Sequence, residues 1–170
     1  QVLHKLERPL VLDASGFSPL IENKIIISEL PTETILTPHY AEFSRIFKLD
    51  LKEVIENPIS AVKDIIEDLA GRVLILKGAT NIIVNSNGDI LLINHGSSAL
   101  ATAGTGDVLT GILGTLLAQG IHINEASLLA VYLHGECVHQ YNKLIGSDGL
   151  IASDLPKMIP YALNEMNYVH

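Results

Sequence analysis

The sequence has few of the features that mark secreted, membrane-spanning or nucleic-acid-binding proteins. Its one cysteine, Cys137, excludes an intramolecular disulfide and fits a reducing compartment. Lys and Arg total only 11 residues against 19 Asp and Glu, and the formal charge of −8 argues against sequence-independent binding to nucleic acid. A signal-peptide pattern is absent, and no apolar run reaches the ~18 residues of a membrane span. We therefore expect a soluble, cytoplasmic protein that binds neither nucleic acid nor a membrane.

The overall amino-acid composition is typical of a globular protein. Hydrophobic residues make up 48% of the 170 residues and charged residues 18%, so the chain has enough apolar surface to form a core. This length predicts a single domain over residues 1–170.

Short apolar runs alternate with helical patterns along the chain. Runs at 9–14, 34–36 and 72–78 predict buried strands, and residues 81–94 predict a β-hairpin that turns at Asn87-Gly88. Helices are expected at 41–47, 107–118 and 124–144. Another helix is expected from Asn57 as N-cap to a stop at Gly71, and a last one with Ser153 as its cap. The alternation predicts an α/β fold with a mostly parallel sheet covered on both faces.

In such a sheet, ligands bind beyond the carboxyl ends of the strands. Three expected strands are followed there by polar residues: Asp13 after the first, His39 shortly after the second, and Lys77 directly after the third. Lys77 is a candidate cation for a phosphate, although a lysine that extends from a strand end to solvent is an equally good interpretation. Asp13 either orients a ligand or caps the segment that follows it.

A glycine-rich segment, "ALATAGTGDVLTG", leads into the helix expected at 107–118. It matches neither the dinucleotide-binding pattern, because Leu109 stands where the third glycine belongs, nor the P-loop, because Ile112 stands where lysine belongs. The backbone of Gly104, Thr105 and Gly106 is expected to form an anion hole at the helix start.

Asp107 follows this anion hole, where its carboxylate would repel a phosphate. An isolated aspartate there would be an ordinary first-turn residue favoured by the helix dipole. The surrounding glycines, which let backbone approach a ligand closely, favour a second interpretation. In it, Asp107 takes a proton from a hydroxyl whose oxygen attacks a phosphorus held by the neighbouring amides, with a cation and Mg²⁺ assisting.

Other polar residues give weaker signals. His39 and Glu42 share one helix face, and taken alone they are best interpreted as a surface histidine and a first-turn glutamate. His134 and His139 in "HGECVH" lack the spacing of a zinc site, and we expect them to be packing or surface residues.

Several segments together resemble one family. "LVLDASG", "ILTPHYAEFSRI", "VLILKGATNIIV", "ALATAGTGDVLTGILGTLLAQG", "AVYLHG" and "GLIASDLPKMIP" occur in the order seen in the ADP/ATP-dependent NAD(P)H-hydrate dehydratases. These form the carbohydrate-kinase-like branch of the ribokinase superfamily. The resemblance covers nearly the whole chain and implies a three-layer αβα ribokinase-like fold. It also implies that an N-terminal part of this fold is absent here.

The resemblance implies a repair reaction. A hydrated NADH or NADPH, the (S)-NADHX or NADPHX form, is phosphorylated on its ring hydroxyl by ADP or ATP with Mg²⁺, and loss of phosphate restores the cofactor. By position, Asp107 is the catalytic base and a substrate contact, and His39 is a second substrate contact. Glu42 matches an acidic position that supports Mg²⁺. The nucleotide-binding residues implied are Lys77, Gly78, Ala79, Thr80, Asn81 and Gly106.

The sequence departs from the family pattern in two places. "KGATN" replaces the usual "KGAGT", which affects the contacts from Thr80 and Asn81, and "HYAEF" replaces the commoner "HPGEF" while keeping His39 and Glu42. The resemblance also implies a homo-oligomer, a tetramer in many family members. Two alternatives to the dehydratase remain open: a ribokinase-like kinase for a small molecule such as a vitamin precursor, and a catalytically silent nucleotide-binding fragment.

Overall fold

A computed structural model describes residues 8–95, 100 and 102–167. Within these residues one sheet of five strands forms the centre of the molecule, and its strands follow one another in space in the order of the chain. The strands are β1 (Leu10–Leu12), β2 (Thr34–Leu36), β3 (Val73–Leu76), β4 (Asn81–Val84) and β5 (Ile90–Ile93).

The sheet is mixed. Strands β1, β2 and β3 run parallel, with Val11 opposite Ile35 and Ile35 opposite Val73. Strands β4 and β5 continue the sheet as antiparallel strands. The hairpin between them turns where the sequence predicts, because Gly88 adopts a φ of +87°, which L-residues with side chains rarely reach.

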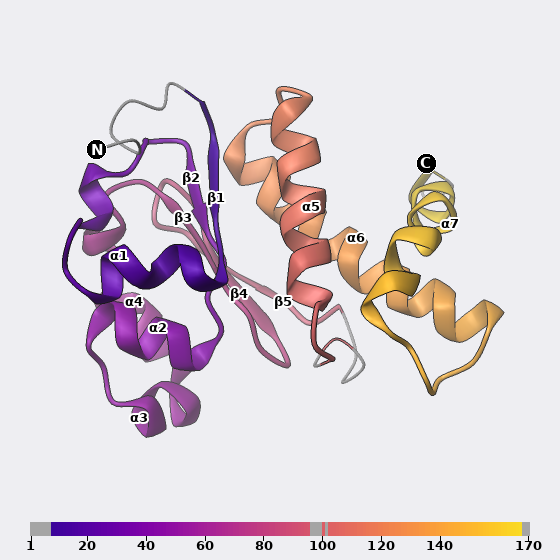
Figure 1. The fold of residues 1–170 in the computed structure, drawn as a ribbon, viewed down its shortest axis with the longest axis horizontal. Helices are drawn as coiled ribbons and strands as arrows, with labels where there is room; N and C mark the ends of the chain where they lie inside the picture. The colour runs from indigo at the N-terminus through magenta and orange to yellow at the C-terminus, as the bar shows by residue number, and fades with distance from the viewer. Residues whose placement is uncertain (1–7, 96–99, 101, 168–170) are drawn as a thin grey trace.

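Helices cover both faces of the sheet, and Figure 1 shows them as two groups with the strands between them. The helices are α1 (Ser18–Ile21), α2 (Tyr40–Phe47), α3 (Leu51–Glu56), α4 (Pro58–Asp64), α5 (Thr105–Ala118), α6 (Ile123–Leu144) and α7 (Leu155–Asn167). The strands supply alternate residues to two cores: Ile35 and Ile75 pack on the side of α5, α6 and α7, while Leu36 and Leu74 pack on the side of α1 to α4. This is the predicted three-layer αβα arrangement.

The helix predicted from Asn57 to Gly71 is shorter than expected. Helix α4 ends at Asp64, and a separate 3₁₀ turn covers Glu67–Leu69. Asn57 precedes the helix but its side chain makes no capping hydrogen bond. The left-handed residue that ends the segment is Ala70, with Gly71 following it in the same region of φ. The prediction of one continuous helix was therefore wrong, although its apolar residues Ile65 and Leu69 are buried.

The last helix also begins differently from the prediction. Ser153 lies inside a 3₁₀ turn at Ala152–Asp154, and α7 begins at Leu155 with Pro156 in its first turn. The side chain that accepts a backbone hydrogen bond at this turn is Asp154, from the amide of Ile151, at 3.4 Å. The predicted cap was therefore wrong: Ser153 lies two residues before the first residue of α7, and the Asp154 side chain bonds back to the start of the 3₁₀ turn rather than to an amide of α7.

The chain that leaves β5 is held against α6. A Cβ atom on Gly135 would lie 2.0 Å from the carbonyl oxygen of His95, so only glycine fits there. The His95 ring stacks on Tyr132, and its Nε2 lies 2.9 Å from Oε2 of buried Glu136. Gln140 donates a hydrogen bond of 2.7 Å to the other oxygen of Glu136. These contacts occupy both oxygens of a buried carboxylate, as its burial requires.

A buried arginine joins the start of β3 to the segment before β2. Arg72 is 5% exposed, and its guanidinium donates hydrogen bonds to the carbonyl oxygens of Ser28, Leu30, Pro31 and Ala70. Removal of this side chain would leave buried carbonyl groups without partners. Within the described part of the chain, no helix combines the length and apolar character that crossing a membrane requires.

Candidate active site

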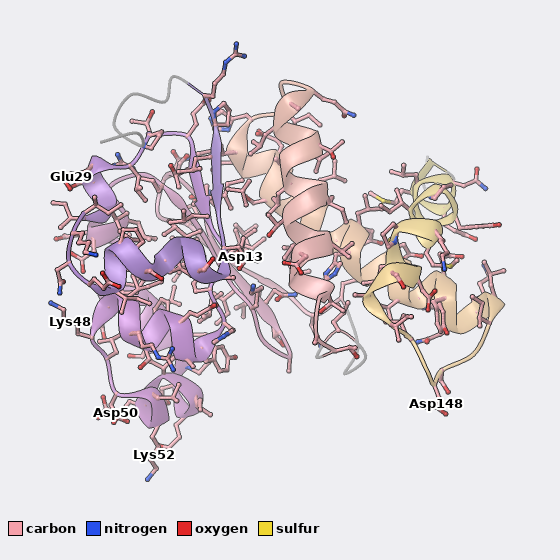
Figure 2. All side chains as sticks on the ribbon, in the orientation of Figure 1. Asp13, Glu29, Lys48, Asp50, Lys52 and Asp148 are labelled. Atoms are coloured by element: carbon pink, nitrogen blue, oxygen red, sulfur yellow. The ribbon has the colours of Figure 1, made fainter. Side chains whose placement is uncertain are left out.

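Polar residues that are far apart in the sequence meet at the carboxyl ends of β1, β2 and β3. Asp13 follows β1, and its Oδ1 accepts a hydrogen bond of 2.8 Å from Nζ of Lys77, which follows β3. Backbone hydrogen bonds continue the sheet past the strands, from the amide of Lys77 to Pro38 (2.8 Å) and from the amide of Thr37 to Leu12 (3.1 Å). Figure 2 shows Asp13 in the middle of the molecule, where β1 ends beside α5.

The start of α5 faces this ion pair. Gly104 precedes the helix with a φ of +88°. A Cβ atom placed on Gly106 would lie 3.2 Å from Nζ of Lys77 and 3.6 Å from Oδ2 of Asp13, so the backbone of Gly106 lies next to both charged groups. Residues 96–99 and 101 of the glycine-rich segment lie outside the described residues.

The three residues expected to form the anion hole differ in what they offer. The amide of Thr105 donates to the carbonyl of Thr102 at 3.3 Å, and the Thr105 hydroxyl points to the carbonyl oxygens of Leu100 (2.6 Å) and Thr102 (2.9 Å). Thr105 therefore stabilises the turn into the helix. The backbone at Gly106, beside Lys77, remains the best-placed part of the predicted anion hole.

Asp107 is exposed in the first turn of α5. Its amide donates to the carbonyl of Gly104 at 3.2 Å, which fixes the backbone of this turn. The carboxylate is thus accessible from solvent at the same helix start as Gly106, as an acid–base group for an incoming substrate must be.

His39 and Glu42 hold the start of α2 beside this edge. Nδ1 of His39 accepts from the amides of Ala41 and Glu42, both at 3.2 Å, and Oε2 of Glu42 accepts from the amide of His39 at 2.9 Å. This is a reciprocal capping box. Because Nδ1 is an acceptor, the neutral ring carries its proton on Nε2. His39 pairs with Lys77 as an extended bridge, so it lies at the expected edge.

The segment from Lys77 to Asn81 makes a bend between β3 and β4. The amide of Gly78 donates to Oδ1 of Asn81 at 3.4 Å. A Cβ atom on Gly78 would lie 2.6 Å from the Tyr40 hydroxyl, so a larger residue there would require the Tyr40 side chain to move. Ala79 is exposed and Thr80 is half-buried at the tip of this bend. Five of the expected nucleotide-binding residues, Lys77 to Asn81, therefore form one continuous segment, and the sixth, Gly106, lies beside Lys77 at the start of α5.

Asp13 makes more contacts than the sequence predicted. Thr110, one turn beyond Gly106 on α5, donates a hydrogen bond of 3.0 Å to Oδ2 of Asp13. Burial alone would raise the pKa of Asp13, but the hydrogen bond and charge of Lys77, with smaller contributions from the hydroxyls of Thr37 and Thr110, hold this pKa below its ordinary value. Thr110 was not predicted as a site residue, and the only signal for it in the sequence is its i+4 spacing from Gly106 on the same helix face.

His134 lies beneath the start of α5. It is 6% exposed, and burial lowers its pKa to about 4, against a hydrogen bond to the Thr105 backbone that acts in the opposite direction. Its Nε2 has no hydrogen-bond partner among the described residues. His139 is exposed, so the two histidines of α6 do face different ways, as predicted. No group of three His, Cys, Asp or Glu side chains in the described part of the chain is arranged to hold a metal ion.

Comparison with known proteins identifies relatives over most of the chain. The NAD(P)H-hydrate dehydratase (Carb_kinase) family model matches residues 1–161. The bifunctional NAD(P)H-hydrate repair enzyme Nnr of Dictyoglomus turgidum is 32% identical over 165 residues, 96% of this chain. The ADP-dependent (S)-NAD(P)H-hydrate dehydratase of Neisseria meningitidis is 33% identical over 152 residues, 88% of this chain.

A solved structure shares the fold. The ADP/ATP-dependent NAD(P)H-hydrate dehydratase of Bacillus subtilis, co-crystallised with ATP and Mg²⁺, superimposes with a TM-score of 0.79 at 31% identity, over 92% of this chain. The chain spans 55% of that protein, 51% of the Neisseria protein and 31% of the Dictyoglomus protein.

Proposed function

The chain belongs to the NAD(P)H-hydrate dehydratase family, and on that premise we propose that its site repairs hydrated NADH or NADPH at the expense of ADP or ATP. The ring hydroxyl of the hydrate takes the terminal phosphoryl group of the nucleotide. Phosphate then leaves together with a proton from the neighbouring ring carbon, and the double bond of the normal cofactor is restored. A hydroxyl is a poor leaving group until it is phosphorylated, which explains the need for a nucleotide.

One observation carries the proposal: Nζ of Lys77 and the backbone of Gly106 lie side by side, with 3.2 Å between Nζ and a Cβ placed on Gly106, at the helix start that carries Asp107. A cation and a helix N-terminus together stabilise the charge of a transferring phosphoryl group. Asp107 takes the proton of the attacking hydroxyl, so that the new O–P bond forms as the nucleotide's terminal O–P bond breaks.

Mg²⁺ fits this site without a ready-made cage of protein ligands. The ion usually keeps several waters and is held by one or two carboxylates together with substrate phosphates. Glu42 is half-buried at the same edge, and its Oε2 caps α2. Glu42 would help to hold the ion, and the bound ion would neutralise phosphate charge. His39 is assigned to donate from Nε2 to the hydrate.

The test measures recovery of NADH from its hydrate by the absorbance of the reduced nicotinamide, with ADP or ATP and Mg²⁺. We expect nucleotide-dependent recovery, and a loss of about 10²- to 10⁴-fold in rate for Asp107→Asn. Asp148→Asn, at an exposed carboxylate far from the site in Figure 2, is the matched control. Accumulation of a stable phosphorylated product would indicate a small-molecule kinase instead. Undiminished recovery in Asp107→Asn would overturn the assignment of the base.

A further inference from the structure

Asp13 joins three elements that the site requires. It follows β1, its Oδ1 accepts from Lys77 after β3, and its Oδ2 accepts from Thr110 on α5. Its side chain is only 10% exposed, so these two contacts occupy both oxygens of a carboxylate that is largely removed from water. A charge in such a place is stable only when it is paired and hydrogen-bonded.

The contact determines where the Lys77 ammonium lies. A lysine side chain has four rotatable bonds and loses rotamer entropy when it is fixed. Lys77 is 22% exposed, and Asp13 holds its Nζ beside Gly106 rather than in solvent. The ammonium has three N–H donors. Asp13 accepts one of them, which leaves donors for a phosphate oxygen at the start of α5.

Thr110 determines which way Asp13 faces. A carboxylate rotates easily about its last bond, because that torsion has a broad energy profile. The hydrogen bond from the Thr110 hydroxyl to Oδ2 fixes this rotation and turns Oδ1 towards Lys77. Since Thr110 and Gly106 are one turn apart on α5, the same helix that presents the backbone of Gly106 also adjusts the cation opposite it.

We propose that Thr110 and Asp13 are positioning residues for nucleotide binding: Thr110 orients Asp13, and Asp13 holds Lys77 at the start of α5 before the nucleotide arrives. The inference rests on the proposed function, because it assumes that Lys77 binds the nucleotide's phosphates. If Asp13 had only a structural role, joining β1 to α5, then loss of its contacts would lower the stability of the fold. It would not weaken ADP binding more than adenosine binding.

The experiment compares the affinity for ADP with Mg²⁺ and for adenosine, by calorimetry, in Thr110→Val and Thr110→Ser. Valine has the shape of threonine without the hydroxyl. We expect Thr110→Val to weaken ADP binding roughly 5- to 10-fold and to leave adenosine binding unchanged, an effect smaller than the loss of a direct hydrogen bond to the phosphate because Thr110 acts through Asp13 and Lys77. Serine keeps the hydroxyl and should restore ADP binding. Thr115→Val is the control, because the Thr115 hydroxyl donates to the Gly111 carbonyl (2.8 Å) on the same helix.

A second arm repeats Thr110→Val in a Lys77→Met background. If Thr110 acts through Lys77, its substitution changes ADP affinity less than about 2-fold there, because coupled residues are not additive. The inference would be overturned if Thr110→Val weakened ADP binding equally in both backgrounds, or if it weakened ADP and adenosine binding equally. Neither result would contradict the proposed nucleotide site. An ADP affinity that Lys77→Met does not change would instead overturn the nucleotide site of the proposed function.

Discussion

Replacing Gly106 by alanine should weaken nucleotide binding while leaving the stability of the fold nearly unchanged. The added Cβ would lie 3.2 Å from Nζ of Lys77 and 3.6 Å from Oδ2 of Asp13. Gly106 lies in the ordinary helical backbone of α5, so alanine brings no backbone strain. Apart from its effect on helix propensity, the methyl group therefore acts on the space between the helix start and the cation, where the proposed phosphate binds.

The substitution has two effects of opposite sign on the free energy of unfolding. Alanine is favoured over glycine inside a helix by about 1 kcal/mol. Against this, the Lys77 ammonium must retreat by a few tenths of an ångström from its contact, and the free energy of unfolding should stay within about 1 kcal/mol of the original value. For the nucleotide, loss of one charge-assisted hydrogen bond costs about 1.5–3 kcal/mol. The Kd for ADP should therefore rise roughly 10- to 100-fold.

Gly111→Ala is the matched control. Gly111 lies in the same helix, and a Cβ atom there would meet no other atom within 4 Å. We would measure the Kd for ADP with Mg²⁺ by calorimetry and the free energy of unfolding by urea titration for both variants. If Gly106→Ala binds ADP as tightly as Gly111→Ala, the phosphate does not lie between Lys77 and the start of α5.

Three further predictions concern stability and are checked by urea unfolding. Gly135→Ala places a Cβ 2.0 Å from the backbone carbonyl that crosses it and should cost about 3 kcal/mol or more, whereas Gly114→Ala, with no atom within 4 Å, should not destabilise the fold. The pKa of His134 is about 4 when folded against about 6.5 when unfolded, so the unfolded chain binds more protons between these values. Stability should therefore fall by up to about 3 kcal/mol from pH 7 to pH 4, and an identical pH profile in His134→Gln would contradict this. Arg72→Met leaves buried carbonyls unpaired and should cost about 3 kcal/mol, whereas Arg45→Met, at an exposed arginine, should cost under about 0.5 kcal/mol.

The sequence predicted the strands and the β4–β5 hairpin well, because their signals are local. Thr34–Leu36 is a strand with the predicted bounds, and Gly88 supplies the left-handed turn residue. The end of α4 was not predictable in the same way. Ile65 and Leu69 are buried whether the chain continues as an α-helix or as a 3₁₀ turn, so the apolar spacing does not reveal the break.

The site was predictable to the extent that topology places it. Parallel strands bring their carboxyl ends to one edge, and this rule correctly brought Asp13 and Lys77 together. It says nothing about which helix residue faces that edge, so Thr110 was missed. Likewise, His39 and Glu42 were expected on one face, but their reciprocal capping depends on backbone geometry that spacing alone does not give.

The order of the strands has a consequence for how the chain folds. The antiparallel pairs are closed by the short connections 77–80 and 85–89, whereas the parallel pairs enclose 13–33 and 37–72. Closing a short loop costs less chain entropy and takes less time, so local pairs form before distant ones. During refolding we expect β3, β4 and β5 to acquire protection from hydrogen exchange first. The parallel strand ends, which bring Asp13 to Lys77, would then assemble last on a sheet that already exists.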